Sequence, residues 1–187
     1  MGDLATNRFI ITGAASAGKT TLIEELSKRG FNCYEEVSRR IIRQQLSISS
    51  NALPWHDMKR FCSLTFDTMI TEHTYQADST LSFFDRAIPD IIANLDSRKL
   101  HIPDSYTQAV VDAGYNKNVF VLPIHPAIFV NDNERRETYK QAEEIYRSII
   151  KVYQSLGFVL HEIPLMPVDQ RAEMVLTKLH TYNYDIV

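Results

Sequence analysis

The stretch RFIITGAASAGKTTLIEE, residues 8–25, decides how the rest of the chain is interpreted. Residues 9–12 are aromatic and β-branched, which favours a buried strand. After a short loop, Leu22, Ile23 and Leu26 recur at the spacing of one helix face. The stretch therefore predicts a strand, a tight loop and a helix in immediate succession.

The loop itself has the composition of a phosphate-binding site. Gly13, Gly18, Lys19 and Thr20 satisfy the spacing G-x-x-x-x-G-K-[ST]. In this motif loop amides surround the phosphates, the lysine reaches the β and γ phosphates, and the hydroxyl ligates Mg²⁺. The loop also leads into a helix N-terminus, which favours an anion. We expect ATP contacts from every residue of the loop: Gly13, Ala14, Ala15, Ser16, Ala17, Gly18, Lys19, Thr20 and Thr21.

Composition narrows the class of protein. With 187 residues, of which 44% are hydrophobic, the chain predicts one domain over residues 1–187 with its own core. A net charge of -3 argues against a nucleic-acid binder. Two cysteines, Cys33 and Cys62, are too few for a zinc signature or a disulfide framework. No apolar run has the length of a membrane span, so we expect a soluble, cytoplasmic protein.

The remaining chain alternates strand and helix patterns. Hydrophobic runs predict further strands at residues 31–34, 81–85, 119–122 and 158–163, and helical patterns separate them. This alternation favours a parallel sheet with helices on both faces. Ligands of such α/β sheets bind beyond the carboxyl ends of the strands.

Charged residues follow two of these strands. The acidic pair Glu35 and Glu36 follows residues 31–34. Asp85 ends the run LSFFD, where a carboxylate is expected to hold Mg²⁺ or its water, with Thr20 as the other metal ligand. Arg86 comes next, and it either faces a phosphate or pairs with a carboxylate.

Three other positions have two interpretations each. Arg39 opens a helix and belongs either to a solvated face or to the site. Trp55 either packs at a helix entry or offers an aromatic platform to a substrate base. Arg135 and Arg136 precede a helix, where they either face solvent or close as a lid onto the transferring phosphate.

Several motifs together resemble one family. They are GAASAGKTTLIEEL, CYEEVSRRII, FFDRAIPD, VFVLP and NERRETYKQAEEIYRSIIKVYQSLGF. In order and spacing they resemble the P-loop ATPase/kinase family that contains the nicotinamide riboside kinase domain of bacterial NAD regulators and related small predicted ATPases. The resemblance implies a P-loop NTPase three-layer α/β/α sandwich with a five-stranded parallel sheet of order 2-3-1-4-5, a helical lid, and Mg-ATP at the loop. It also implies that Glu36 with Arg39, and Asp85 with Arg86, match site motifs of the family.

Two functions fit these observations. One is a kinase for a nucleoside-like or other hydroxyl metabolite. Its catalytic residues would be Lys19, Glu36, Asp85 and Arg135, with Arg136 as the other lid arginine, and its substrate-binding residues would be Glu36, Arg39, Trp55 and Arg86. The other is a non-catalytic or slowly hydrolysing nucleotide switch that binds a protein or lipid partner. A kinase needs a closed pocket into which Glu36, Arg39 and Arg86 point, whereas a switch does not.

Overall fold

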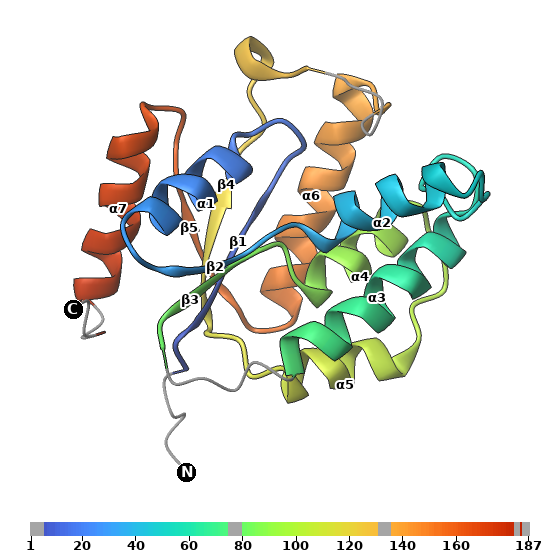
Figure 1. The fold of residues 1–187 in the computed structure, drawn as a ribbon, viewed down its shortest axis with the longest axis horizontal. Coiled ribbons are helices and arrows are strands. Elements are labelled where there is room, and N and C mark those ends of the chain that lie inside the picture. The colour runs from blue at the N-terminus through green and yellow to red at the C-terminus, as the bar shows by residue number, and fades with distance from the viewer. Residues whose placement is uncertain (1–5, 75–79, 131–135, 182–183, 185–187) are drawn as a thin grey trace.

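The computed structural model describes residues 6–74, 80–130, 136–181 and 184, which form an α/β domain (Figure 1). Its strands are β1 (Arg8–Gly13), β2 (Asn32–Tyr34), β3 (Ser82–Asp85), β4 (Asn118–Leu122) and β5 (Val159–Glu162). Its helices are α1 (Lys19–Lys28), α2 (Val37–Ser47), α3 (Met58–Thr74), α4 (Ile88–Ser97), α5 (Asp104–Asp112), α6 (Tyr139–Ser155) and α7 (Val168–Thr181). The short 3-10 helix η1 (Pro126–Ile128) precedes α6. The expected strands and helices are all present, with small differences at their ends.

The sheet has five parallel strands in the order β2-β3-β1-β4-β5, which confirms the expected order. Ile11 of β1 pairs with Asp85 of β3 on one side and with Phe120 of β4 on the other. The chain turns from β1 toward one edge of the sheet and later crosses to the opposite edge. The loop after β1 therefore lies where the strand order reverses, the place at which open α/β sheets bind ligands.

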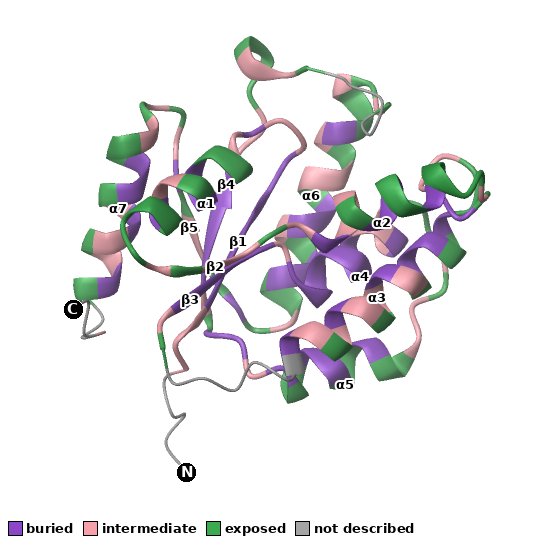
Figure 2. Ribbon diagram, viewed as in Figure 1, coloured by how far each residue is buried: buried purple, intermediate pink, exposed green. Residues whose placement is uncertain are grey.

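The side chains of β1 point alternately to the two faces of the sheet, and each face has its own layer of core. Phe9 and Ile11 pack with the apolar faces of α1 and α7, whereas Ile10 packs against the cluster formed by α2 to α6. Figure 1 shows α1 and α7 on one face of the sheet and the other helices on the opposite face. Figure 2 shows buried residues along the strands and on the helix faces that meet them. Successive side chains of a strand point to opposite faces, so β1 contributes to both layers.

The start of helix α6 and its buried face both follow from its sequence. Thr138 and Gln141 form a capping box, in which Gln141 N donates to Thr138 Oγ1 (3.3 Å) and Thr138 N donates to Gln141 Oε1 (2.8 Å). Its apolar stripe packs mainly on α4, and Ser148 Oγ donates to the Ala93 carbonyl at 2.9 Å. The cap and the stripe fix where the helix begins and which face covers the sheet.

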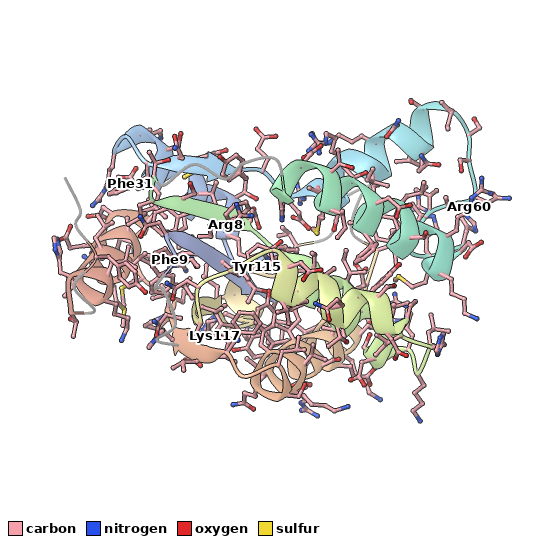
Figure 3. The ribbon with its side chains drawn as sticks, turned by 90° about the horizontal axis from the view of Figure 1, so that it is seen from below. Arg8, Phe9, Phe31, Arg60, Tyr115 and Lys117 are labelled. Carbon is pink, nitrogen blue, oxygen red and sulfur yellow. The ribbon has the colours of Figure 1, made fainter. Side chains whose placement is uncertain are left out.

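The amino ends of the central strands are closed by packed side chains. Arg8 and Tyr115 lie side by side there (Figure 3), with the guanidinium carbon 5.7 Å from the tyrosine ring and 4.9 Å from that of Phe84. His73 Nδ1 and the Tyr115 hydroxyl are 2.5 Å apart. Burial lowers the pKa of His73 to about 3, so this histidine stays neutral. None of the described helices is long and apolar enough to cross a membrane.

Candidate functional site

The loop between β1 and α1 begins at a glycine that no other residue can replace without a shift. Gly13 has φ 136°, and a Cβ added there would lie 2.1 Å from the Leu122 carbonyl oxygen. The next amide, Ala14 N, donates to the same oxygen at 3.1 Å. The loop is thus held against the end of β4, with its backbone directed over the sheet.

Lys19 folds back over this loop. Its Nζ donates to the Ala14 carbonyl at 2.7 Å and lies 3.4 Å from that of Gly13, and the side chain is buried. An ammonium held over loop amides at a helix N-terminus forms a concentrated positive field. The arrangement is suited to an anion such as a nucleotide phosphate.

Arg171 of α7 contacts the loop between β1 and α1. The sequence analysis did not predict this contact. Its Nη1 donates to the Ala17 carbonyl at 3.0 Å and would lie 2.7 Å from a Cβ added at Gly18. The guanidinium is buried on α7. Its position in the sequence could have indicated this role, because Arg171 lies on the same buried helix face as Val175 and Leu179, where an apolar residue is expected.

Thr20 and Asp85 meet beside the loop. Thr20 Oγ1 donates to Asp85 Oδ2 at 3.4 Å, and Asp85 is only 2% exposed. Its other oxygen, Oδ1, is buried and has no hydrogen-bond partner among the described residues. Burial and, next, the charge of Glu36 raise the pKa of Asp85 to about 6. A hydroxyl and an unsatisfied carboxylate oxygen fit Mg²⁺, which takes one or two protein oxygens and completes its shell with phosphates and water.

In the described parts of the chain, no group of three or more His, Cys, Asp or Glu side chains is placed to hold a metal ion.

Arg86 forms hydrogen bonds with the residue that precedes α2 and with a residue in the first turn of α4. Its Nε donates to Glu36 Oε1 and its Nη1 to Asp90 Oδ1, both at 2.9 Å. Burial by itself lowers the pKa of this guanidinium, but the carboxylates outweigh it and raise the pKa above its ordinary value. Glu36 Oε2 also lies 3.7 Å from Arg39 Nε. The structure thus brings Glu36, Arg39 and Arg86 together, and the backbone of Arg86 adopts a left-handed φ of 68° to do so.

Asp90 fixes Arg86 in turn. Besides Arg86, the carboxylate accepts hydrogen bonds from Thr12 Oγ1 (2.5 Å), Ala87 N (2.9 Å) and the Tyr153 hydroxyl (2.6 Å). These four donors saturate a buried carboxylate. Asp90 is therefore a positioning residue that joins β1, α4 and α6 behind the site.

Two cavities meet at this network. The apolar-lined cavity, of about 80 Å³, has walls from α2, α3, α4 and α6: Ala15, Glu36, Ser38, Arg39, Ile42, Pro54, Met58, Phe61, Arg86, Asn94, Glu137, Ala142 and Ile145. The charged cavity, of about 510 Å³, lies between α1 and α2: Thr20, Ile23, Glu24, Ser27, Lys28, Cys33, Glu35, Glu36, Arg39, Arg40, Arg43 and Asp85. Glu36 and Arg39 line both, so they form the wall between them.

Trp55 and Arg136 contact each other beside the apolar-lined cavity. Trp55 is not among the residues that line the apolar-lined cavity. Its ring lies 4.2 Å from the guanidinium carbon of Arg136, which precedes α6. Ser16 Oγ donates to the Val130 carbonyl at 2.7 Å, so the phosphate loop touches the segment that leads to α6. Arg135 lies outside the described residues.

Comparison with known proteins agrees with this geometry. A family model of an AAA domain, AAA_28, matches residues 8–171. No curated protein matches the chain in sequence.

Solved structures share the fold. The chain is similar to deoxyadenosine kinase from M. mycoides with bound dCTP, with 17% identity and a TM-score of 0.60 over 93% of this chain and 99% of that one. It is similar to the NadR protein in complex with NR, with 15% identity and a TM-score of 0.69 over 97% of this chain and 52% of that one. It is also similar to thymidylate kinase from Candida albicans, with 11% identity and a TM-score of 0.66 over 95% of this chain and 92% of that one. At these identities the likeness shows a P-loop kinase fold.

Proposed function

Because this chain belongs to the AAA domain family AAA_28, and because Thr20 and Asp85 meet beside its phosphate loop, we propose that it is a Mg-ATP-dependent phosphotransferase. Its acceptor is a nucleoside-like metabolite with a free hydroxyl. The observation that carries the proposal is Asp85 Oδ1, which is buried and has no hydrogen-bond partner among the described residues. The other oxygen of this carboxylate, Oδ2, lies 3.4 Å from the Thr20 hydroxyl.

The donor side of the reaction uses the loop. Its amides and Lys19 hold the β and γ phosphates, and Arg171 keeps the loop in shape. Thr20 and Asp85 hold Mg²⁺, which neutralises charge on the phosphates when bound. Catalysis by such sites rests on positioning and on electrostatic stabilisation.

The acceptor side uses Glu36. This carboxylate lines the apolar-lined cavity, whereas Asp85 lines only the charged cavity together with Thr20. Of these two carboxylates, Glu36 is therefore the one that faces an acceptor hydroxyl, and Asp85 is the one that faces the metal. A carboxylate within hydrogen-bond reach of the hydroxyl orients it and accepts its proton.

The charges of the apolar-lined cavity favour a neutral acceptor. Arg86 is paired with Glu36 and Asp90, and Arg39 lies 3.7 Å from Glu36. Paired guanidinium groups leave little net positive charge for a phosphorylated acceptor. Ile42, Met58, Phe61 and Ile145 give the wall an apolar part that suits the flat ring of a base.

The test is ADP release from Mg-ATP with a panel of nucleosides that includes nicotinamide riboside. We expect one class of nucleoside to stimulate turnover, Lys19→Ala to abolish it, and the exposed Lys140→Ala to leave it unchanged. Tight nucleotide binding without stimulated turnover by any hydroxyl compound contradicts phosphotransfer.

That second outcome would favour the other candidate, a nucleotide-dependent switch with a protein or lipid partner. The observation on its side is the volume of the apolar-lined cavity, about 80 Å³, which is below that of a metabolite site. A phosphotransferase must therefore open this cavity to admit its acceptor, whereas a switch need not.

A further inference from the structure

Helix α4 carries one polar side chain into the apolar-lined cavity without a protein partner. The sequence of the helix is IPDIIANLDS, and most of its residues are buried. Asn94 is half-buried and lines the cavity. Its backbone carbonyl accepts a hydrogen bond from Ser97 Oγ (2.9 Å), but its carboxamide has no hydrogen-bond partner among the described residues.

The other polar residues of α4 are all accounted for by the fold. Asp90 accepts four hydrogen bonds. Asp96 accepts from Ser148 Oγ at 2.8 Å and pairs with Lys151 at 2.9 Å. Asparagine disfavours a helix interior. Asn94 thus differs from Asp90 and Asp96 in that its side chain has no hydrogen-bond partner among the described residues.

Asn94 and Glu36 line the same cavity. Its wall also includes the apolar side chains of Ile42, Phe61 and Ile145. A ligand that places a hydroxyl at Glu36 offers a flat apolar body to these side chains and a polar edge to Asn94.

A carboxamide is both a donor and an acceptor, and it pairs best with an edge that offers the same two functions side by side. We infer that Asn94 reads such an edge on the acceptor, which is a nucleoside whose base carries adjacent hydrogen-bond donor and acceptor groups, as a carboxamide or an amino-substituted ring does. The inference rests on the proposed function for the place of the hydroxyl, and it adds the residue that selects the base.

Equilibrium binding to the full chain in the presence of Mg-ADP tests the inference without relying on turnover. The probes are two pairs: adenosine with purine riboside, which lacks the amino group, and nicotinamide riboside with 3-acetylpyridine riboside, which lacks the amide N–H. We expect the wild type to bind the complete member of at least one pair at least about tenfold more tightly. Asn94→Leu should remove this preference, and Ser97→Ala, on the same helix but outside the cavity, should keep it.

A structural role for Asn94 predicts a different set of results. Leucine favours a helix interior more than asparagine does, so Asn94→Leu should unfold thermally at the same temperature as the wild type or higher. The inference is overturned if the wild type binds neither pair, if it binds both members of each pair equally, or if Asn94→Leu keeps the preference. Selective binding that is lost in Asn94→Leu, without turnover in the wild type, supports Asn94 and rejects phosphotransfer.

Discussion

Arg86 Nε lies 2.9 Å from Glu36 Oε1, so the residue after β3 holds the carboxylate that opens α2. The two residues are 50 positions apart in the chain. This pair holds Glu36 on the wall between the two cavities.

Glu36→Gln should therefore suppress phosphoryl transfer more than nucleotide binding. Loss of a group that orients and deprotonates the acceptor lowers such rates by about 10²–10⁴-fold. We expect a change of this order in single-turnover transfer, with ADP affinity within a few-fold of the wild type. Glu144→Gln, an exposed carboxylate that lines neither cavity, is the matched control. A normal transfer rate with weakened ADP binding would assign Glu36 to the nucleotide side.

Asp85→Asn should stabilise the protein near neutral pH. The folded-state pKa is raised from 3.8 to about 6. An acid with a raised pKa keeps its proton longer in the folded chain, so its contribution favours folding at low pH and is lost as pH rises from about 4 to about 6. Above that window the wild type bears the cost of a buried charge, of the order of 1–3 kcal/mol, which the amide avoids.

Urea unfolding at several pH values measures this difference. The gain of Asp85→Asn over the wild type should be largest near pH 7 and should shrink toward pH 4. The same variant should lose Mg²⁺-dependent nucleotide binding, because an amide is a weaker ligand than a carboxylate. A variant less stable than the wild type at pH 7 would mean that Asp85 is held by contacts within the protein.

Arg171→Ala should weaken nucleotide binding although the side chain lies behind the loop. Arg171 Nη1 holds the Ala17 carbonyl at 3.0 Å, and without it the loop loses a buried hydrogen bond that shapes the phosphate site. A hydrogen bond from a charged donor contributes about 1.5–3 kcal/mol, so we expect ADP affinity to fall at least about tenfold. Titration with a fluorescent ADP analogue measures it, and Lys178→Ala on the same helix is the control. Unchanged affinity would limit Arg171 to packing.

Trp55 and Arg136 should act as a unit at the rim of the apolar-lined cavity. Their 4.2 Å contact joins the segment before α3 to the segment before α6, and both segments flank that cavity. A double-mutant cycle with Trp55→Leu and Arg136→Gln, read as acceptor KM, should give a coupling of about 0.5–2 kcal/mol. Additive effects of the two changes would show that the contact plays no part in holding the acceptor.

Gly13→Ala should be among the most damaging substitutions in the chain. The added Cβ would meet the Leu122 carbonyl at 2.1 Å, and the backbone φ of 136° disfavours any side chain. We expect a loss of more than about 3 kcal/mol in urea unfolding. Gly114 has φ 60° but open space around it, so Gly114→Ala measures the cost of the backbone conformation without a steric clash. We expect this substitution to cost about 1 kcal/mol. Equal losses at the two glycines would contradict the steric argument.

Local patterns in the sequence were sufficient for the strands, the helices and the tight loop between β1 and α1. The spacing of Gly13, Gly18 and Lys19 reflects a backbone geometry that few residues permit, and hydrophobic periodicity reports which side of each element is buried. Glu36 and Asp85 could be selected because each lies at the carboxyl end of a predicted strand, and parallel strands end at the same edge of a sheet. The family resemblance supplied the strand order.

Only the tertiary structure decided which side chains meet. Asp90 with Tyr153, and Arg171 with Ala17, join residues 63 and 154 positions apart. Periodicity shows that a position is buried but not what it faces, so a charged residue on an apolar stripe gives no sign of its partner. The same limit applies to Asn94, which the sequence does not distinguish from other polar residues of a helix. It is the packing of α2, α3 and α6 near α4 that makes Asn94 part of a cavity wall.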